Sequence, residues 1–168
     1  MLERLHLLAL RVFAHLPRPT RRFLVRAGSP KYTVGAICIV RRADGALLLV
    51  RHSYWSRWGT PGGLAKRGER PADAAVRETM EEVHLAIELD GEPVVVVEPR
   101  SNRVDVVFLA RPASGADLED VRPSSPEITA LAWFDPADLP DLQSETATAL
   151  AALVRAGRTT LQGSGIGA

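Results

Sequence analysis

This sequence of 168 residues contains one cysteine and few aromatic residues, and its net charge is close to zero. The single cysteine, Cys38, excludes an internal disulfide and a zinc site built from several cysteines, so we expect a reducing, cytoplasmic compartment. No apolar run reaches the roughly 20 residues that a membrane-spanning helix needs, so we expect no transmembrane segment. The length suits a single domain with a substantial core.

Net charge is only +1, but the basic residues are concentrated at the start of the chain. Residues 1–31 contain six arginines and one lysine against a single acid, Glu3, so that segment carries +6 and the remainder of the chain −5. An acidic remainder argues against a nucleic-acid-binding surface over the whole domain, and we expect no nucleic-acid partner. A basic face at the start of the chain stays open.

Residues 1–30 are expected to form a helical extension. Apolar residues recur at helical spacing from Leu2 to Leu16, and Pro17 ends the pattern. Thr20 is expected to cap a second helix that ends at Gly28. Three roles are open for this segment: packing against the rest of the chain, a homodimer contact, or a basic helix on a membrane surface.

Apolar and β-branched segments separated by turn residues predict strands in the rest of the chain. The first two, joined by the turn at 43–45, are expected to form a hairpin. The valine run is expected to be buried on both faces. A last helix over about residues 143–156 and a flexible tail, residues 158–168, complete the chain. The expected strands are residues 32–41, 46–51, 85–89, 94–98, 104–110 and 128–134.

Residues 58–85 are the most informative stretch, because a glycine-rich turn and a loop lead there into an acidic helix. Glu78, Glu81 and Glu82 stand at i, i+3 and i+4, so their side chains project from one face. Crowded carboxylates repel one another unless a cation lies among their oxygens, and hard divalent ions such as Mg²⁺ prefer these ligands. The face expected to pack on the core contains Ala72, Val76, Thr79, Met80 and Val83.

The spacing resembles the signature of the Nudix hydrolase family, G-x5-E-x7-R-E-U-x-E-E-x-G-U, where U is a bulky apolar residue. Seven positions match, far more than a lone glycine pattern contains. Thr79 departs from the pattern at the first apolar position. His84 stands where the family has a glycine that ends the helix in a left-handed conformation. The matching residues are Gly63, Glu69, Arg77, Glu78, Glu81, Glu82 and Leu85.

The resemblance covers about residues 32–156 and implies an α/β (α+β) fold, an α/β/α sandwich with a mixed β-sheet. We therefore expect a Nudix domain over residues 31–157, with the N-terminal extension outside it. The resemblance also implies Mg²⁺-dependent hydrolysis of a diphosphate bond in a nucleoside diphosphate derivative, with Mn²⁺ able to substitute. The candidate substrates are nucleoside triphosphates, ADP-ribose or another nucleotide sugar, and dinucleotides.

The same resemblance assigns roles to the acidic side chains. Glu78 and Glu82 are expected to be the principal metal ligands, supported by Glu81 and by a backbone carbonyl of Gly62 or Gly63. The general base is open, because family members take it from the motif helix or from a distant loop.

Three further residues outside the glutamate cluster, Glu69, Arg77 and Glu127, have expected roles in catalysis. Glu127, at the end of a long polar connection, is the loop candidate for the base. Arg77 is within reach of Glu81 and of the loop that carries Glu69, so we expect it to hold the cluster in shape.

Substrate contacts are expected from residues just before the motif. Tyr54 and Trp55 can stack on a base, and Arg51 or Arg57 can meet a phosphate, although packing at a rim explains them equally well. Gly62 and Gly63 let the main chain approach the metal and the phosphates. The polar turn at 100–105 is another candidate border of the substrate. We expect no metal role for His52.

Family subtypes differ by markers after the motif. A tyrosine there is typical of enzymes for diadenosine polyphosphates, and no tyrosine follows Tyr54. A proline marks ADP-ribose enzymes, and Pro99 favours that substrate slightly. Two other functions are open: a catalytically weak, Nudix-like nucleotide-binding regulator, which the intact glutamates disfavour, and an isopentenyl diphosphate isomerase, for which Cys38 in an apolar strand is a poor catalytic residue.

Overall fold

The computed structural model describes residues 2–159, and its contacts divide the chain into two compact units, Met1–Lys31 and Tyr32–Ala168. The first unit contains α1 (Leu2–His15) and α2 (Arg18–Gly28). Thr20 lies inside α2 and does not cap it, because Pro19 fits the first helical turn, where its missing N–H is not needed. No described helix has the length and apolar character required to cross a membrane.

The second unit contains one mixed sheet of four strands and one antiparallel sheet of three strands. Its strands are β1 (Thr33–Val40), β2 (Leu47–His52), β3 (Trp58–Gly59), β4 (Gly62–Leu64), β5 (Ile87–Glu98), β6 (Arg103–Pro112) and β7 (Ile128–Phe134). The larger sheet has the order β4-β1-β6-β5, in which β1 and β6 are parallel, and the smaller has the order β3-β2-β7.

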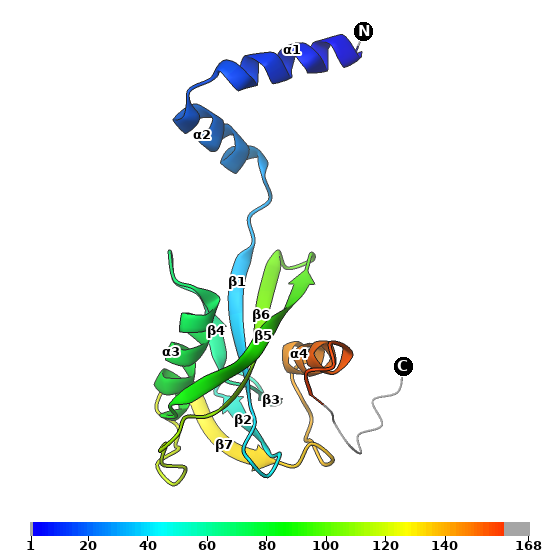
Figure 1. Ribbon diagram of the computed structural model, residues 1–168. Helices are drawn as coiled ribbons and strands as arrows, with labels where there is room; N and C mark the ends of the chain where they lie inside the picture. The colour runs from blue at the N-terminus through cyan, green and yellow to red at the C-terminus, as the bar shows by residue number, and fades with distance from the viewer. Residues whose placement is uncertain (1, 160–168) are drawn as a thin grey trace. The chain divides into compact units, whose positions relative to one another are not determined.

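Alternate residues of β1 pack into two different hydrophobic cores, because neighbouring side chains of a strand point to opposite faces. Ala36 and Cys38 join a core shared with α3 (Pro71–Val83), whereas Ile37 and Ile39 join a core shared with α4 (Ser144–Arg155). Figure 1 shows α3 and α4 on opposite faces of the larger sheet. The fold is therefore the expected α/β/α sandwich with a mixed sheet.

The expected hairpin of the first two strands is wrong. Among the described strands, β1 and β2 share only an isolated bridge between Arg41 and Leu47. β1 pairs with β4 and β6, while β2 pairs with β3 and β7. The two strands diverge after this one bridge beside the turn, and each belongs to a different sheet.

The valine run is also not a central strand. It forms the second half of β5, which continues through the expected turn with a shift of register between Asp90 and Val94. β5 lies at the edge of the larger sheet, and Val95 and Val97 are 59% and 54% exposed. A high β-propensity predicts a strand but does not determine its place in a sheet.

The end of the chain is partly packed. Gly157 follows α4 with φ of 67°, and Arg158 donates its backbone N–H to the carbonyl of Leu153 at 2.9 Å. Thr159 is buried. Residues 160–168, the larger part of the segment expected to be a flexible tail, lie outside the described residues.

We expect Cys38 to be unreactive in the folded protein. Its side chain is fully buried beside α3, and this burial raises the pKa of the thiol to about 12. Labelling with a thiol-reactive disulfide at pH 8 should give no signal in native buffer and one thiol per chain after denaturation. Rapid labelling without denaturant would contradict this packing of the core.

Candidate active site

The buried face of α3 includes one of the motif glutamates. Val76 and Met80, which were expected on the core face, are each 38% exposed, whereas Glu82 is only 5% exposed. The buried face is rotated from the expected one, because Ala75, Thr79 and Glu82 follow one another at i, i+4 and i+7 on one side of the helix. It consists of Ala74, Ala75, Thr79, Glu82 and Val83.

Two backbone hydrogen bonds satisfy carbonyl groups at the C-terminal end of α3. His84 has the left-handed conformation expected at this position of the motif, with φ of 55°, and donates its N–H to Met80 at 3.1 Å. The carbonyl of Glu82 then accepts the N–H of Ser124 at 2.8 Å, from the long connection between β6 and β7. Free carbonyls at a helix end need such partners. This contact brings the end of the connection, with Glu127, to the same place as α3.

The carboxylate of Glu82 is held inside the protein by backbone and side-chain contacts. Its Oε2 accepts the N–H of Gly62 at 3.1 Å, and its Oε1 lies 3.8 Å from Nε2 of His52. Burial raises the pKa of Glu82, and the contacts with His52 and Gly62 act in the opposite direction. A desolvated carboxylate of this kind attracts a cation.

His52 is in turn held by Gln143, a contact that the sequence does not indicate. Nε2 of Gln143 lies 3.2 Å from Nδ1 of His52 and 3.1 Å from the carbonyl of Arg57. When the amide N–H groups of Gln143 are used in this way, Nδ1 of His52 is an acceptor and Nε2 carries the proton that faces Glu82. Gln143 reaches this position because its backbone N–H binds the carbonyl of Trp58 at 2.8 Å.

The two glycines of the turn are required by close contacts. Gly62 has φ of 152°, and a Cβ there would lie 2.3 Å from the carbonyl oxygen of Ala36 in β1. A Cβ on Gly63 would lie 2.5 Å from the carboxylate of Glu78. The turn therefore passes directly over both glutamates, and larger residues would displace either the strand or the carboxylate.

Arg77 joins three glutamates on the outer side of α3. Its Nε and Nη2 bind Glu69 at 2.7 and 3.0 Å, and its Nη1 binds Glu78 at 2.7 Å and Glu81 at 3.0 Å. The hydrogen bonds from Arg77, and then the backbone N–H of Lys66, lower the pKa of Glu69 to about 2. This is the contact set that the motif spacing predicts for an orienting arginine.

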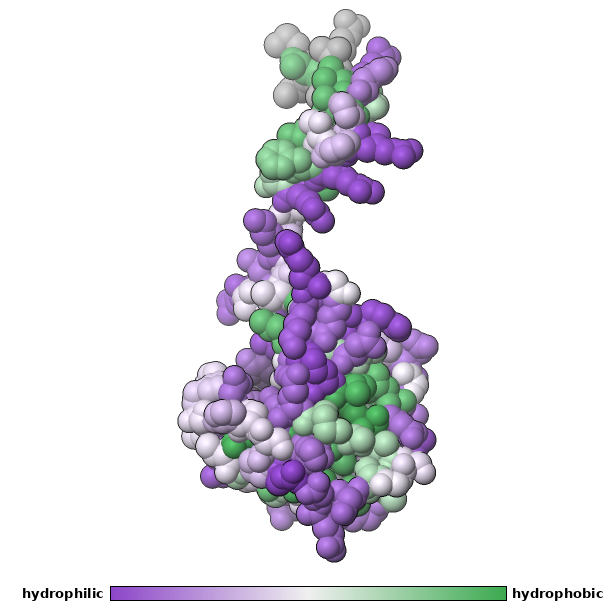
Figure 2. Space-filling model, turned by 90° about the vertical axis from the view of Figure 1, so that its left-hand side faces the viewer, coloured by the Kyte–Doolittle hydropathy of each residue, from purple (hydrophilic) through white to green (hydrophobic). Residues whose placement is uncertain are grey.

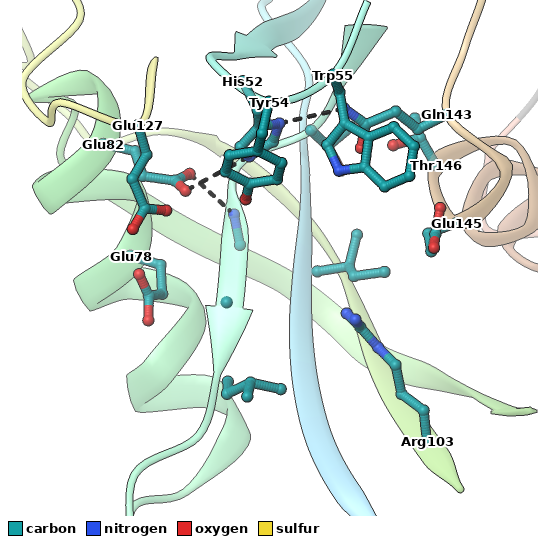
Figure 3. Close-up of a pocket in the computed structure, with 15 residues that line it drawn as sticks. His52, Tyr54, Trp55, Glu78, Glu82, Arg103, Glu127, Gln143, Glu145 and Thr146 are labelled. Atoms are coloured by element: carbon teal, nitrogen blue, oxygen red, sulfur yellow. Dashed lines mark hydrogen bonds and ion pairs between the residues drawn. The ribbon is translucent and has the colours of Figure 1, made fainter. Parts of the chain in front are cut away.

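A cleft of about 470 Å³ brings most of the expected site residues together. Figure 3 shows Glu78, Glu82 and Glu127 on one side of it, with Trp55 and Glu145 on the other. The expected residues that line the cleft are Tyr54, Trp55, Gly62, Gly63, Glu78, Glu82, Arg103 and Glu127, and the residues added by the structure include His52, Gln143, Glu145 and Thr146.

The other expected site residues do not line this cleft. Glu69 and Arg77 act beside it, and the side chain of Glu81 is 52% exposed and contacts Arg77. The guanidinium of Arg51 lies 4.7 Å from the ring centroid of Trp58, and Arg57 contacts Gln143 through its carbonyl. The phosphate contacts expected for Arg51 and Arg57 therefore gain no support.

Arg103 is the arginine that does line the cleft, from the first position of β6. Its Nε donates to both carboxylate oxygens of Asp105, at 2.8 and 3.0 Å. Gly35 leaves room for this pair, since a Cβ there would overlap Asp105. The polar turn at 100–105 was an expected border of the substrate, and through Arg103 it reaches the cleft.

The donor chemistry of the cleft fits a divalent cation. Within the part of the chain that the structure describes, no three histidine, cysteine or acidic side chains are arranged to hold a metal by themselves. Mg²⁺ usually keeps several waters and is bound through one or two carboxylates together with substrate phosphates. Glu78 and Glu82 supply two carboxylates, and the missing Cβ of Gly63 leaves the space beside Glu78 open.

Known proteins resemble the second unit of the chain. A family model described as the NUDIX domain matches residues 31–155. A "MutT-like protein" of Streptomyces ambofaciens is 30% identical over 116 residues, which cover 69% of this chain and 72% of that protein. A Bacillus subtilis (strain 168) protein with the name "Putative 8-oxo-dGTP diphosphatase" is 31% identical over 109 residues, 65% of this chain and 70% of that protein.

Solved structures agree with the sequence matches. The crystal structure of a MutT NUDIX hydrolase from Burkholderia pseudomallei superposes with a TM-score of 0.61 and 31% identity. The match covers 73% of this chain and 98% of that one. The residues that the family model matches include both sheets and the helix that carries the glutamates.

Replacing Arg77 should release Glu69. In Arg77→Met we expect the pKa of Glu69 to rise from about 2 toward its ordinary value of 4.5, because its main hydrogen-bond donor is lost. Since the folded-state pKa is depressed, this pair stabilises the fold above about pH 4.5, and the contribution is lost as the pH falls toward 2. NMR titration of the glutamate carboxyls measures the shift. An unchanged pKa in the variant would mean that Arg77 does not hold the loop.

Proposed function

Because this chain belongs to the Nudix hydrolase family, we propose that it cleaves a diphosphate bond in a nucleoside diphosphate derivative, a nucleoside triphosphate above all, with Mg²⁺. The chain is a pyrophosphohydrolase, an enzyme that acts on phosphorus-containing anhydrides. The observation that carries the proposed substrate class is the cleft itself, where carboxylates face exposed aromatic side chains and an arginine. A cleft of about 470 Å³ falls in the usual range for small-molecule sites.

Glu78 and Glu82 would hold the divalent cation, and Mn²⁺ could replace Mg²⁺. When bound, the ion neutralises phosphate oxygens and positions a water for attack on phosphorus. Arg77 orients Glu78 from the outer side, and His52 and the N–H of Gly62 orient Glu82 from the inner side. The protein thus keeps both carboxylates in place before the substrate arrives.

Glu127 is the proposed general base. It lines the cleft together with Glu78 and Glu82, and its backbone carbonyl is fixed by the N–H of Ser53 at 2.7 Å. A carboxylate on this wall can take the proton of a water that attacks the bound diphosphate. A motif glutamate is the alternative base.

Aromatic and basic side chains of the cleft would recognise the nucleoside and its phosphates. Tyr54 and Trp55 are 63% and 56% exposed, with ring centroids 6.4 Å apart, and exposed aromatic rings offer stacking surfaces for a base. Arg103 supplies a positive charge for a phosphate that lies away from the glutamates. Pro99, the marker that favours ADP-ribose, does not line the cleft, so nucleoside triphosphates come first.

An isopentenyl diphosphate isomerase would need an accessible catalytic cysteine. Cys38 is fully buried and burial raises its pKa, so it can meet no substrate in the cleft. With its single cysteine and no internal disulfide, the protein is proposed to work in the cytoplasm.

We expect Glu82→Gln to lower kcat by more than about 100-fold, because even residues that only support a metal ligand cost about 10 to 100-fold. Glu127→Gln should also lower kcat by at least about 100-fold if it removes the general base. The control is Glu92→Gln, which changes an exposed glutamate of β5 and should keep wild-type turnover. Wild-type rates in Glu82→Gln, with a normal thermal unfolding curve, would overturn the assignment.

A panel of substrates decides between a catalyst and a binding regulator. Phosphate and pyrophosphate release should be measured with ordinary and oxidised nucleoside triphosphates, ADP-ribose and a dinucleotide, each with Mg²⁺, Mn²⁺ or a chelator. Turnover should require the metal and be fastest with a nucleoside triphosphate. Nucleotide binding without turnover of any compound would support the regulator.

Trp55→Ala should raise KM more than it lowers kcat, since stacking is lost and the carboxylates remain.

A further inference from the structure

Residues 1–31 form a unit that exposes apolar and basic side chains together. α2 buries none of its residues, and Phe23, its largest apolar side chain, is 70% exposed. A soluble surface rarely exposes so many large apolar side chains without a partner. The exposed apolar residues of this unit are Leu5, Leu7, Leu10, Val12, Phe23, Leu24 and Val25.

Basic and apolar side chains adjoin one another on α2. Arg18, Arg22 and Arg26 recur at spacings of four, so they share one side of the helix. Phe23 lines a shallow hollow together with these three arginines. Figure 2 shows green hydrophobic surface beside rows of purple side chains in this unit. The basic residues meet no acid in α2, because the helix contains none.

The same arginines line a groove between α1 and α2. Its walls include Phe13 and Val25 together with Arg18, Arg22 and Arg26, and its volume is about 600 Å³. A concave surface with guanidinium groups around apolar side chains offers hydrogen-bond donors to an anion and a place for a hydrocarbon chain.

We propose that residues 1–31 bind reversibly to a membrane surface rich in anionic lipids, with the apolar side chains among the acyl chains and the arginines on the headgroup phosphates. Helices of this character lie in the interface, and neither described helix is long and apolar enough to cross the bilayer. Each basic residue near an anionic surface strengthens binding about fivefold. The segment carries +6, which suits this partner.

Two other partners fit the surface less well. A second copy of the segment would cover the apolar side chains but would bring two groups of charge +6 together. A nucleic acid would neutralise the arginines through its phosphates but would leave Phe23, Leu24 and the leucines of α1 without apolar contact. An anionic lipid surface satisfies both kinds of side chain.

The test uses the full chain and two kinds of vesicle, phosphatidylcholine alone and phosphatidylcholine mixed with phosphatidylglycerol. Co-sedimentation should show binding to the mixed vesicles, little binding to the neutral ones, and weakening as salt is raised. The triple variant R18Q/R22Q/R26Q should weaken binding about 100-fold. F23S/L24S should also weaken it, because insertion between acyl chains is lost.

The matched control removes three exposed arginines from the second unit, R70Q/R111Q/R155Q, and should bind as the wild type does. All variants should keep the nucleotide hydrolysis of the wild type, so that a failed membrane proposal is distinguished from a failed catalytic one. Equal binding to neutral vesicles, or equal loss in the control, would overturn the proposal. So would binding to duplex DNA without vesicle binding, or a dimer in light scattering that F23S/L24S dissociates and vesicles do not affect.

Discussion

The buried carboxylate of Glu82 is the contact on which the rest of the site depends. It lies on the face of α3 that packs against the sheet, and it is satisfied by the N–H of Gly62 and by His52. Burying a carboxylate costs free energy unless such partners are present, so the turn, β2 and α3 must all be in place. The same arrangement leaves Glu82 open toward the cleft, where a cation can compensate its charge.

The motif and its local structure could be predicted from the sequence, because they depend on residues close together in the chain. The spacing of Glu78 and Glu82, the left-handed His84, the contacts of Arg77 and the bounds of β7 all follow from short-range patterns. The contact of His52 with Gln143 could not be predicted, since it joins residues 91 positions apart through strand pairing.

Misplaced strands and side chains have a common cause. The valine run and the first two strands were assigned to the wrong neighbours because apolar patterns indicate burial and not partner order. Arg51 was expected at a phosphate, but its guanidinium lies over the ring of Trp58, and Arg51 does not line the cleft. The two units of the chain also differ in charge. The acidic second unit contains the candidate active site, and the basic first unit has an exposed surface that lies outside the match to the family.

A structure with Mn²⁺ and a non-hydrolysable nucleotide tests the central claim most directly, because the anomalous scattering of manganese locates the ion. We expect an anomalous peak at about 2.0–2.3 Å from carboxylate oxygens of Glu78 and Glu82, next to Gly63, with the diphosphate in contact with the ion. A peak bound to other residues, or a nucleotide held outside the cleft, would contradict it.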